Sequence, residues 1–402
     1  MKILLTHNYY RSEAPSGEDN VARAEEKLIR DKGVSVVTFN KFNDEFDSYS
    51  LRQKIYASKE LIWSSKSYWQ IKSLLKIEKP DIAHFHNIFY LISPSVYYAC
   101  KDTGTPVVQT LHNFRFFCAN GLLLRNGKIC EDCIGRVPWR SIFFGCNRDS
   151  TLYSLPVSLM EIVHHWFKTW NKTVDVYIAL SEFSKRKFIE AGLPEEKIFV
   201  KPNFLLNPPQ PLFKNKGYIV FIGRLSQEKG VLTLIKGIKI LQEKSKCFNL
   251  SLKIIGDGPQ KKELMTKVRR YGIQKIEFLG KKRQEECVGL LRNSSFIVIP
   301  SLCYENFPMS IVEALACGKP IIASNIGSIP EIIEDGKTGF LFEPGDPFDL
   351  AKKIKWMFEN EDACIEMGKN SRAEFERKYT AESNYALLME IYRKAIKEKR
   401  NA

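Results

Sequence analysis

The chain has 402 residues, of which 44% are hydrophobic and 12% aromatic, so it can bury large cores and is long enough for two or three domains. Its 61 Lys and Arg outnumber its 46 Asp and Glu, and the formal net charge of +15 calls for an acidic partner. Nucleic acid, an anionic membrane surface and a phosphorylated substrate all qualify, but no zinc-finger pairing, arginine-rich tract or aromatic RNA-binding motif is present, so nucleic acid ranks last.

No segment of the sequence predicts membrane insertion or secretion. No apolar run approaches the roughly 20 residues of a membrane span, and the apolar start at residues 1–5 turns polar at Thr6, which is too short for a secretion signal. We therefore expect a cytoplasmic protein, with peripheral attachment to the inner face of the plasma membrane as an alternative. Its ten cysteines are expected to be reduced rather than disulfide-bonded.

Apolar runs alternate with helical patterns through the first half of the chain, which is typical of a parallel sheet with helices between its strands. The expected strands are residues 3–6, 34–39, 82–85, 107–110, 176–179 and 198–200. The pattern resets after Pro202, and the Pro- and Asn-rich stretch 207–211 is typical of an interdomain linker. We therefore predict an α/β, Rossmann-like domain over residues 1–204.

Four histidines and one glycine fall close to the ends of these strands. His7, His84, His86 and His112 stand at or just after a strand end, and Gly17 lies between the first strand and the helix that follows it. In open α/β sheets, ligands bind in the crevice outside the carboxyl ends of the strands. These residues are therefore candidates to line a cleft. The alternatives are buried structural histidines and a glycine that serves only the geometry of its turn.

Four cysteines lie in an insertion over residues 114–148, directly after His112. Cys130 and Cys133 are separated by two residues and flanked by Cys118 and Cys146. Such a set can satisfy tetrahedral zinc, which needs four deprotonated soft ligands at about 2.3 Å. We expect either a structural zinc site or an incidental cluster of reduced or redox-active thiols.

An apolar and aromatic stretch over residues 152–170 follows the insertion. We expect it to form a helix that packs in the core. The alternative is an interfacial surface, because Trp166, Phe167 and Trp170 with nearby Arg136 and Arg140 would suit an anionic membrane.

A second series of strands follows the linker and predicts a second Rossmann-like domain over residues 205–380. The expected strands are residues 218–222, 252–255, 276–279, 296–299 and 321–323. After the first of them, Gly223, Arg224 and Lys229 precede a helix over residues 231–241. A helix start supplies about half a positive charge and the two side chains add full ones, so this loop predicts an anion site.

Two glutamates eight positions apart mark the start of another helix in this domain. Glu305 stands in the loop after strand 296–299, and Glu313 lies about two turns along a helix that Gly318 and Pro320 stop. Pro308 suits the first turn of that helix and leaves the neighbouring amides free to face a ligand. A solvated surface loop is the alternative.

This block resembles the acidic motif of retaining glycosyltransferase family 4, in which two glutamates flank seven residues. The resemblance implies the GT-B fold, with two Rossmann-like domains facing across a cleft and a C-terminal helix, residues 381–402, that returns to the first domain. It implies that Glu305 and His112 contact the transferred sugar. It implies sugar and ribose binding by Asn306, Phe307, Pro308, Met309 and Glu313. Diphosphate binding falls to Arg224, Lys229 and Gly17. Cysteine-containing insertions are familiar in some bacterial members.

The implied activity is transfer, with retention, of a sugar from a UDP- or GDP-linked donor to a glycan or polyprenyl-linked acceptor in cell-surface polysaccharide synthesis. No Asp-x-Asp motif for a divalent metal is present, so we expect no catalytic cofactor. The alternatives are a nucleotide-sugar epimerase of the same fold and a nucleotide-sugar-binding protein without activity.

Overall fold

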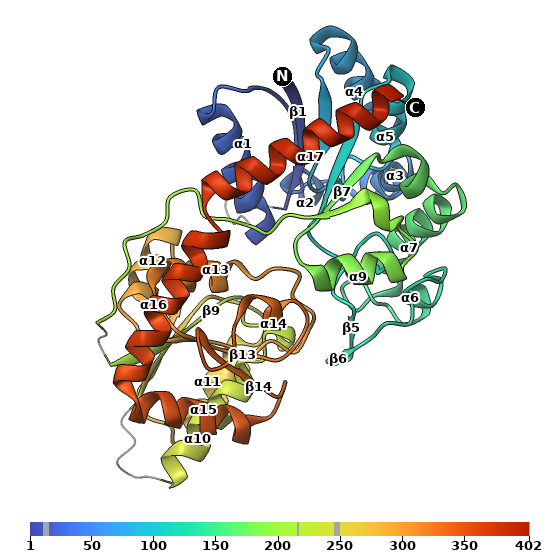
Figure 1. Cartoon of the computed structure of the whole chain (residues 1–402). Helices are drawn as coiled ribbons and strands as arrows, with labels where there is room; N and C mark the ends of the chain where they lie inside the picture. Colours follow the sequence, from blue (N-terminus) through green and yellow to red (C-terminus); the bar gives the residue numbers. More distant parts are fainter. Residues whose placement is uncertain (11–15, 215–216, 245–249, 402) are drawn as a thin grey trace. The chain divides into compact units, whose positions relative to one another are not determined.

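The computed structural model describes residues 1–10, 16–214, 217–244 and 250–401, and the chain divides into two compact units (Figure 1). The first comprises Met1–Leu123, Cys130–Leu206 and Ala381–Ala402, and the second comprises Leu124–Ile129 and Asn207–Thr380. The chain therefore leaves the first unit twice, for Leu124–Ile129 and again after Leu206, and re-enters it finally with its last helix.

The first unit is built on a six-stranded sheet in the order β2-β1-β3-β4-β7-β8, with every neighbouring pair parallel. Its strands are β1 (Lys2–Tyr9), β2 (Ser35–Phe42), β3 (Ile82–Phe85), β4 (Val107–Leu111), β7 (Val176–Ala179) and β8 (Ile198–Val200). Strands β3, β4 and β7 are buried along their whole length. Continuous apolar runs are what a parallel sheet covered on both faces requires.

Helices cover this sheet and connect its strands. They are α1 (Gly17–Asp31), α2 (Asp44–Asp47), α3 (Leu51–Ile62), α4 (Ser65–Glu78), α5 (Ser95–Thr103), α6 (Arg140–Phe143), α7 (Thr151–Trp166), α8 (Thr169–Thr173), α9 (Glu182–Glu190), the 3-10 turn η1 (Glu195–Lys197) and the C-terminal α17 (Ala381–Asn401). Leu388 and Tyr392 of α17 pack on Ile3 of β1 and Ile82 of β3 in one apolar cluster. The last helix is thus part of the core of the first unit.

The second unit repeats the architecture with the strand order β11-β10-β9-β12-β13-β14, again parallel. Its strands are β9 (Tyr218–Ile222), β10 (Ser251–Ile255), β11 (Ile276–Gly280), β12 (Ile297–Ile299), β13 (Ile321–Ser324) and β14 (Gly339–Phe342). The short segment Leu124–Ile129, which belongs to this unit, is an antiparallel pair of β5 (Leu124–Arg125) and β6 (Lys128–Ile129).

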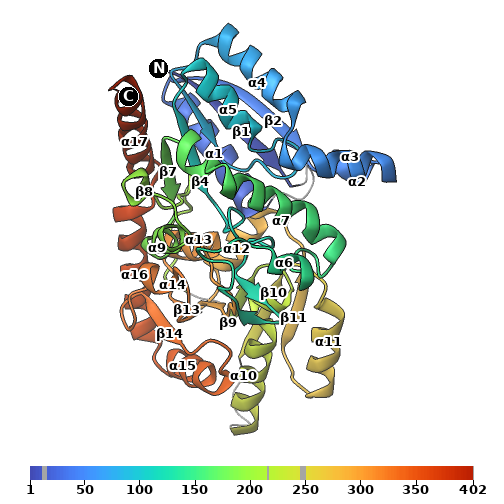
Figure 2. The same ribbon diagram turned by 90° about the vertical axis from the view of Figure 1, so that its right-hand side faces the viewer.

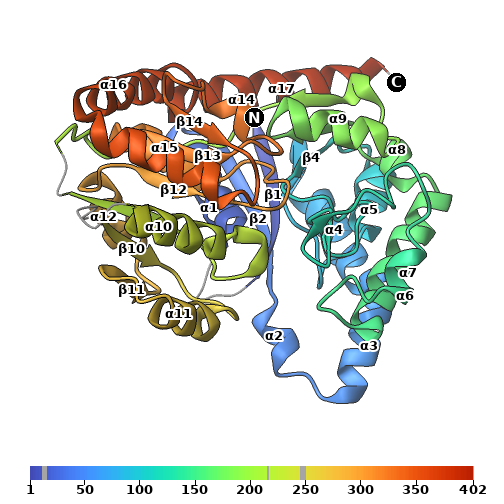
Figure 3. The same cartoon turned by 90° about the horizontal axis from the view of Figure 1, so that it is seen from below.

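The helices of the second unit are η2 (Gln227–Lys229), α10 (Val231–Lys244), α11 (Lys261–Arg270), α12 (Gln284–Arg292), α13 (Met309–Cys317), α14 (Ile329–Ile332), α15 (Pro347–Glu359) and α16 (Glu361–Lys378). Helices α10 and α15 run side by side (Figure 3), and Leu234 and Leu350 share a cluster with Ile254 of the sheet. The prediction of two Rossmann-like α/β domains is confirmed. Among the described helices, none combines the length and hydropathy needed to cross a membrane.

Candidate functional site

In the second unit, two loops that follow neighbouring strands are drawn together by a glycine. The φ angle of Gly230 is +64°, and a Cβ atom placed there would lie 1.8 Å from the carbonyl oxygen of Pro300, just after β12. The backbone N–H of Leu302 donates to the carbonyl oxygen of Glu228 at 2.7 Å. Only glycine permits this approach, which places η2 beside the loop that carries Glu305.

The approach creates a Lys229–Glu305 ion pair. The Nζ atom of Lys229 lies 2.6 Å from Oε1 of Glu305, and the hydroxyl of Ser301 donates to the same oxygen at 2.7 Å. Burial alone would raise the pKa of Glu305, but Lys229 and Ser301 hold that pKa below its ordinary value. Glu305 is therefore a carboxylate whose position is fixed before any ligand binds.

The backbone of Glu305 is held from its other side by the loop after β13. The Ser328 hydroxyl donates to the Glu305 carbonyl oxygen at 2.7 Å, and a Cβ atom on Gly327, whose φ is +63°, would lie 3.1 Å from Tyr304 and Glu305 backbone atoms. Three loops from neighbouring strands thus converge on one carboxylate.

Arg224, exposed in the loop after β9, makes no ion pair within the described part of the chain.

Helix α13 presents the second glutamate in a different environment. Burial raises the pKa of Glu313 to about 7, and its described hydrogen bond is a long one of 3.4 Å from Gln284. Asn306 is buried, and neither its Oδ1 nor its Nδ2 has a partner among the described residues. Phe307 packs on Tyr379 with ring centres 5.7 Å apart, so its backbone rather than its side chain is available to a ligand. Unpaired buried amides mark a place where a polar ligand would be stabilised.

Pro308 flanks the start of α13, and Met309 is its first residue. Both therefore stand at a helix N-terminus, where free backbone amides favour an electron-rich ligand group.

In the first unit, the start of α1 is held by an acidic cap. Ser16 and Asp19 form a capping box, and Asp19 also accepts a hydrogen bond from Nε2 of His7 at 2.8 Å. The Nδ1 atom of His7 accepts from the backbone N–H of Asn87 at 3.3 Å. Both nitrogens of His7 are therefore used within the unit, and this buried side chain does not line an open surface.

Gly17 is the first residue of α1 and its backbone is not in the left-handed region. A Cβ atom added to it would meet no described atom within 4 Å. The interpretation of Gly17 as a glycine that serves only backbone geometry is therefore wrong, since the backbone there would accept any residue.

His86 and His112, after β3 and β4, form a buried chain of hydrogen bonds with an acid that the sequence analysis did not single out. The Nε2 atom of His112 lies 2.8 Å from Nδ1 of His86, and Nε2 of His86 lies 3.1 Å from Oε1 of Glu25. The other oxygen of Glu25 is 2.7 Å from Nζ of Lys201. Glu25 and Lys201 are almost fully buried.

The protonation states in this chain follow from its partners. Burial alone would raise the pKa of Glu25, but Lys201 and the histidines hold it well below its ordinary value, so Glu25 only accepts. Burial, with His84 nearby, lowers the pKa of His86 to about 3. A neutral His86 must donate from Nε2 to Glu25 and accept at Nδ1, so His112 carries its hydrogen on Nε2. The lone pair on Nδ1 of His112 is left to accept a hydrogen bond.

His84 has a different role from the one expected. Its Nδ1 is 2.7 Å from the hydroxyl of Tyr392 on α17, and its Nε2 is 2.8 Å from the hydroxyl of Thr110. The side chain is fully buried, because it projects from β3 toward the face that α17 covers. It packs α17 onto the sheet and does not line a cleft.

The four cysteines of the insertion lie near one another but are not gathered around one point. Burial raises the pKa of Cys133 to about 12, and the thiols of Cys118, Cys146 and Cys130 add to that shift. Among the described residues, three potential metal ligands within 4.8 Å of one another occur only at Glu25, His84 and His86, whose atoms bond to one another and to Lys201 and Tyr392. Binding of a tetrahedral zinc ion would require these sulfur atoms to draw closer to one another than they lie in the structure. Zinc stays a prediction.

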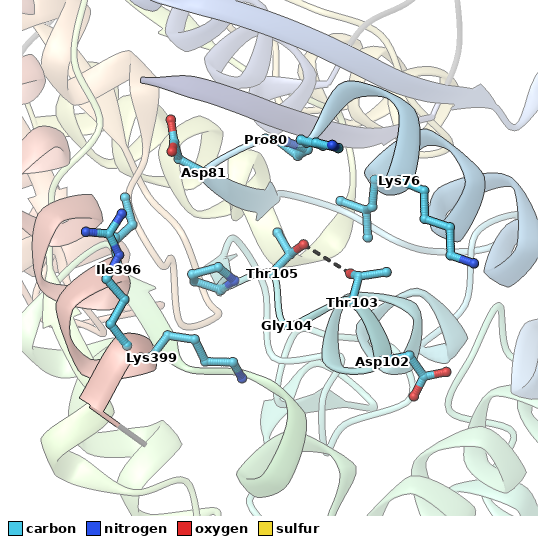
Figure 4. Close-up of a pocket in the computed structure, with 13 residues that line it drawn as sticks. Lys76, Pro80, Asp81, Asp102, Thr103, Gly104, Thr105, Ile396 and Lys399 are labelled. Carbon is cyan, nitrogen blue, oxygen red and sulfur yellow. Dashed lines mark hydrogen bonds between the residues drawn. The ribbon is translucent and has the colours of Figure 1, made fainter.

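A pocket of about 510 Å³ in the first unit lies away from these residues (Figure 4). Asp81 and Thr105, which line it, precede β3 and β4, so it opens at the amino ends of the strands. His86 and His112 follow the same strands at their carboxyl ends, where parallel sheets bind ligands. The pocket therefore does not belong to the candidate site.

Two models of protein families cover most of the chain. The one described as Glycosyltransferase Family 4 matches residues 30–205, and the one described as Glycosyl transferases group 1 matches residues 205–374. The chain belongs to glycosyltransferase family 4. The expected family is confirmed.

Curated relatives of this family 4 chain share part of their length with it. A glycosyltransferase of Methanocaldococcus jannaschii is 30% identical over 232 residues, which cover 54% of this chain and 65% of the relative. The amylovoran biosynthesis glycosyltransferase AmsK of Erwinia amylovora is 29% identical over 233 residues, covering 54% and 56%. The D-rhamnosyltransferase WbpZ of Pseudomonas aeruginosa is 33% identical over 154 residues, covering 38% and 40%. The chain thus spans less than two thirds of the length of these relatives.

Solved structures match nearly the whole family 4 chain. Anabaena HepE in complex with UDP covers 97% of this chain and 99% of its own at a TM-score of 0.65 and 20% identity. Sucrose-phosphate synthase of Thermosynechococcus elongatus covers 98% of both chains at a TM-score of 0.69 and 16% identity. The predicted GT-B fold is confirmed.

Within the chain, the structure brings some of the predicted residues into contact and leaves others apart. In the second unit, Lys229 contacts Glu305, while Arg224 and Glu313 do not contact that pair. In the first unit, His86 contacts His112, and His7 is tied to Asp19. The sequence analysis missed Glu25, although it is an acid on the apolar face of α1, between Val21 and Leu28, where a charge needs a buried partner.

Proposed function

We propose that this chain transfers a sugar, with retention of configuration, from a nucleotide-sugar donor to a glycan or polyprenyl-linked acceptor in polysaccharide synthesis. The observation that carries the proposal is the Lys229–Glu305 ion pair, held by three loops at the carboxyl edge of the second sheet. Two proteins similar to this chain support the proposed donor and pathway: HepE was solved with UDP and with UDP-glucose, and AmsK is an amylovoran biosynthesis glycosyltransferase.

The donor diphosphate would meet Arg224 and Lys229. Arg224 is exposed after β9, and Lys229 stands at the turn before α10, so their charges and the start of that helix face the same loop. These groups oppose the negative charge that develops on the leaving nucleotide, so we propose catalysis without an added divalent metal. Activity that a chelator abolishes and manganese restores would contradict this part.

The sugar and ribose would meet the two glutamates. Glu305 is an ionised carboxylate with one oxygen occupied by Lys229 and Ser301, so its other oxygen is free to accept a sugar hydroxyl. Glu313, in the middle of α13, would accept the ribose hydroxyls, as acids do in other nucleotide sites. His112, neutral and with a free Nδ1, would accept a hydroxyl hydrogen of the substrate.

The Cys303 thiol near Glu305 is buried, and this burial raises its pKa, which makes it a weak nucleophile, so we propose same-face attack by the acceptor hydroxyl. The bond from the anomeric carbon to the nucleotide breaks as the new glycosidic bond forms, and a donor phosphate oxygen takes the acceptor proton. The chain contributes positioning and electrostatic stabilisation.

An assay of donor turnover with and without acceptor tests the function. Purified chain is incubated with UDP- and GDP-linked sugars and with a polyprenyl-linked glycan, and the anomeric configuration of the product is read by NMR. We expect nucleoside diphosphate release that depends on acceptor and yields the donor's configuration. Release of nucleotide and free sugar without acceptor would indicate an epimerase, and binding without release would indicate a protein without activity.

We also propose zinc at Cys118, Cys130, Cys133 and Cys146 in a structural role. Metal analysis of the purified chain tests it. Zinc far below one equivalent would overturn it.

A further inference from the structure

Helix α7 turns its polar side chains inward. Its buried face comprises Ser154, Val157, Ser158, Met160, Glu161 and His164. His164 bonds to the hydroxyl of Thr169 and to the carbonyl oxygen of Ile62, both at 2.8 Å, and Ser154 donates to the carbonyl oxygen of Ser150. The inner face thus mixes apolar and polar side chains. His164 and the serines are hydrogen-bonded within the first unit, whereas neither carboxyl oxygen of Glu161 has a partner among the described residues.

The outer face of α7 is apolar. Leu152 is 75% exposed and Trp166 is 73% exposed, and Leu155 and Leu159 lie exposed between them. Spacings of three, four and seven residues place all four on one stripe of the helix. A helix on the surface of a globular domain normally has the opposite polarity, with apolar residues inward. The expectation that residues 152–170 pack in the core is therefore right for Met160 and wrong for this stripe.

Helix α6 and its flanks expose further aromatic side chains next to α7. Trp139, Phe143 and Phe144 are 51%, 74% and 55% exposed, and the rings of Trp139 and Phe143 pack edge to face at 5.6 Å. Helix α6 packs against α7 (Figure 2), and the hydroxyls of Ser141 and Ser158 join them. We call the surface formed by the exposed residues of α6 and α7 the aromatic face; its members are Trp139, Phe143, Phe144, Leu152, Tyr153, Leu155, Leu159, Trp166 and Phe167.

Basic side chains are interspersed with the aromatic face along the chain. The exposed ones between residues 136 and 172 are Arg136, Arg140, Arg148, Lys168 and Lys172, whereas Asp149 is the one exposed acid in that range. The guanidinium groups of Arg140 and Arg148 lie 5.7 Å and 5.3 Å from the ring centres of Trp139 and Tyr153. Apolar rings interspersed with cations match the interface of a bilayer that carries anionic headgroups.

We propose that the aromatic face docks the protein on an anionic phospholipid bilayer. Its rings enter the boundary between headgroups and acyl chains, and the interspersed arginines and lysines meet the phosphates. This inference deepens the proposed function, because an acceptor linked to a polyprenyl anchor would be presented at such a surface.

The test is flotation of the full chain with vesicles of phosphatidylcholine alone and of phosphatidylcholine mixed with phosphatidylglycerol. We expect the chain to float with the anionic vesicles and not with the neutral ones, and high salt to weaken binding. The variant W166S/F167S should reduce the bound fraction at least tenfold. The variant F348S, which removes a 64% exposed ring from α15 in the second unit, should not.

The outcomes separate this inference from the proposed function. UDP or GDP should raise the thermal unfolding temperature equally in wild type and in W166S/F167S. If neither nucleotide stabilises either protein, that result would count against the proposed function and not against docking. Failure of wild type to float, or flotation that W166S/F167S retains, would overturn docking. Self-association that W166S/F167S abolishes, without flotation, would assign the aromatic face to a second copy of the chain.

Discussion

The two units hold their candidate site residues in position in different ways. In the second unit, a single exposed turn carries Lys229 to Glu305, and the pair depends on backbone approaches at Gly230 and Gly327. In the first unit, His112 is reached through a buried chain that ends at the Glu25–Lys201 ion pair. The Lys229–Glu305 pair is fixed by close backbone approaches, whereas His112 is fixed by side chains that lie far apart in the sequence.

The largest effect is expected at the backbone approach in the second unit. Gly230→Ala would force a Cβ atom to 1.8 Å from the Pro300 carbonyl, and we expect it to cost more than about 3 kcal/mol of unfolding free energy. Gly272 is the matched control, because it has the same φ of +64° but nothing within 4 Å of its Cβ position. Gly272→Ala should cost about 1 kcal/mol. Equal losses in denaturant unfolding would show that the approach at Gly230 is unimportant.

Breaking the buried Glu25–Lys201 ion pair of the first unit should lower the unfolding free energy by a comparable amount. Glu25→Gln leaves the Lys201 charge buried and uncompensated, and we expect a loss of about 3–5 kcal/mol. Adding Lys201→Met should recover most of that loss, as measured by a double-mutant cycle in urea. Because the pKa of Glu25 is held low, its stabilisation is complete above the usual carboxyl range and is lost as pH falls toward the lowered value. A double variant as unstable as Glu25→Gln alone would refute the pairing.

The activity should depend most on Glu305. Glu305→Gln keeps the shape but removes the charge opposite Lys229, and we expect transfer to fall by about 100- to 1000-fold. Thermal unfolding should stay within a few degrees of wild type. Transfer at the wild-type rate would remove Glu305 from the mechanism.

A pH effect is expected from Glu313. Its pKa of about 7 means that it is protonated below that pH, and a protonated acid loses most of its capacity to accept ribose hydroxyls. The KM for the donor should therefore rise as pH falls from 8 to 6, by about tenfold per unit below the pKa at most. Glu313→Gln should raise KM and abolish this dependence. The same pH profile in wild type and Glu313→Gln would assign the titration to another group.

The smallest effect on stability is expected at Gly17. Because its backbone is ordinary and its surroundings are open, Gly17→Ala should change the unfolding free energy by less than about 0.5 kcal/mol. A rise in the KM for the donor would then show that a ligand approaches α1 at this residue. An unchanged KM would remove Gly17 from the diphosphate site.

The contrast between the units explains what the sequence could predict. Helix α13 was expected to end at Gly318, and it does, because that residue caps the helix in the left-handed conformation. The loops after β9 and β12 were expected to carry binding residues because their motifs are contiguous. Strand β14 was not predicted, because Gly339 interrupts its pattern and its place is set by pairing with β13.

The side-chain network of the first unit could not be predicted in the same way. Glu25 and Lys201 are 176 positions apart, and their contact follows from how α1 packs on the sheet. Likewise, the composition of α7 predicted a helix and left open whether its apolar stripe faces the core or the surface, since an inward polar residue such as His164 finds its partners only in the folded unit.

The most direct test of the central claim is calorimetric titration of UDP- and GDP-linked sugars into wild type and into Arg224→Met and Lys229→Met variants. The account predicts binding of donors with one of the two bases to wild type, and at least tenfold weaker binding to each variant. Absence of binding to wild type, or equal affinity in all three proteins, would contradict it.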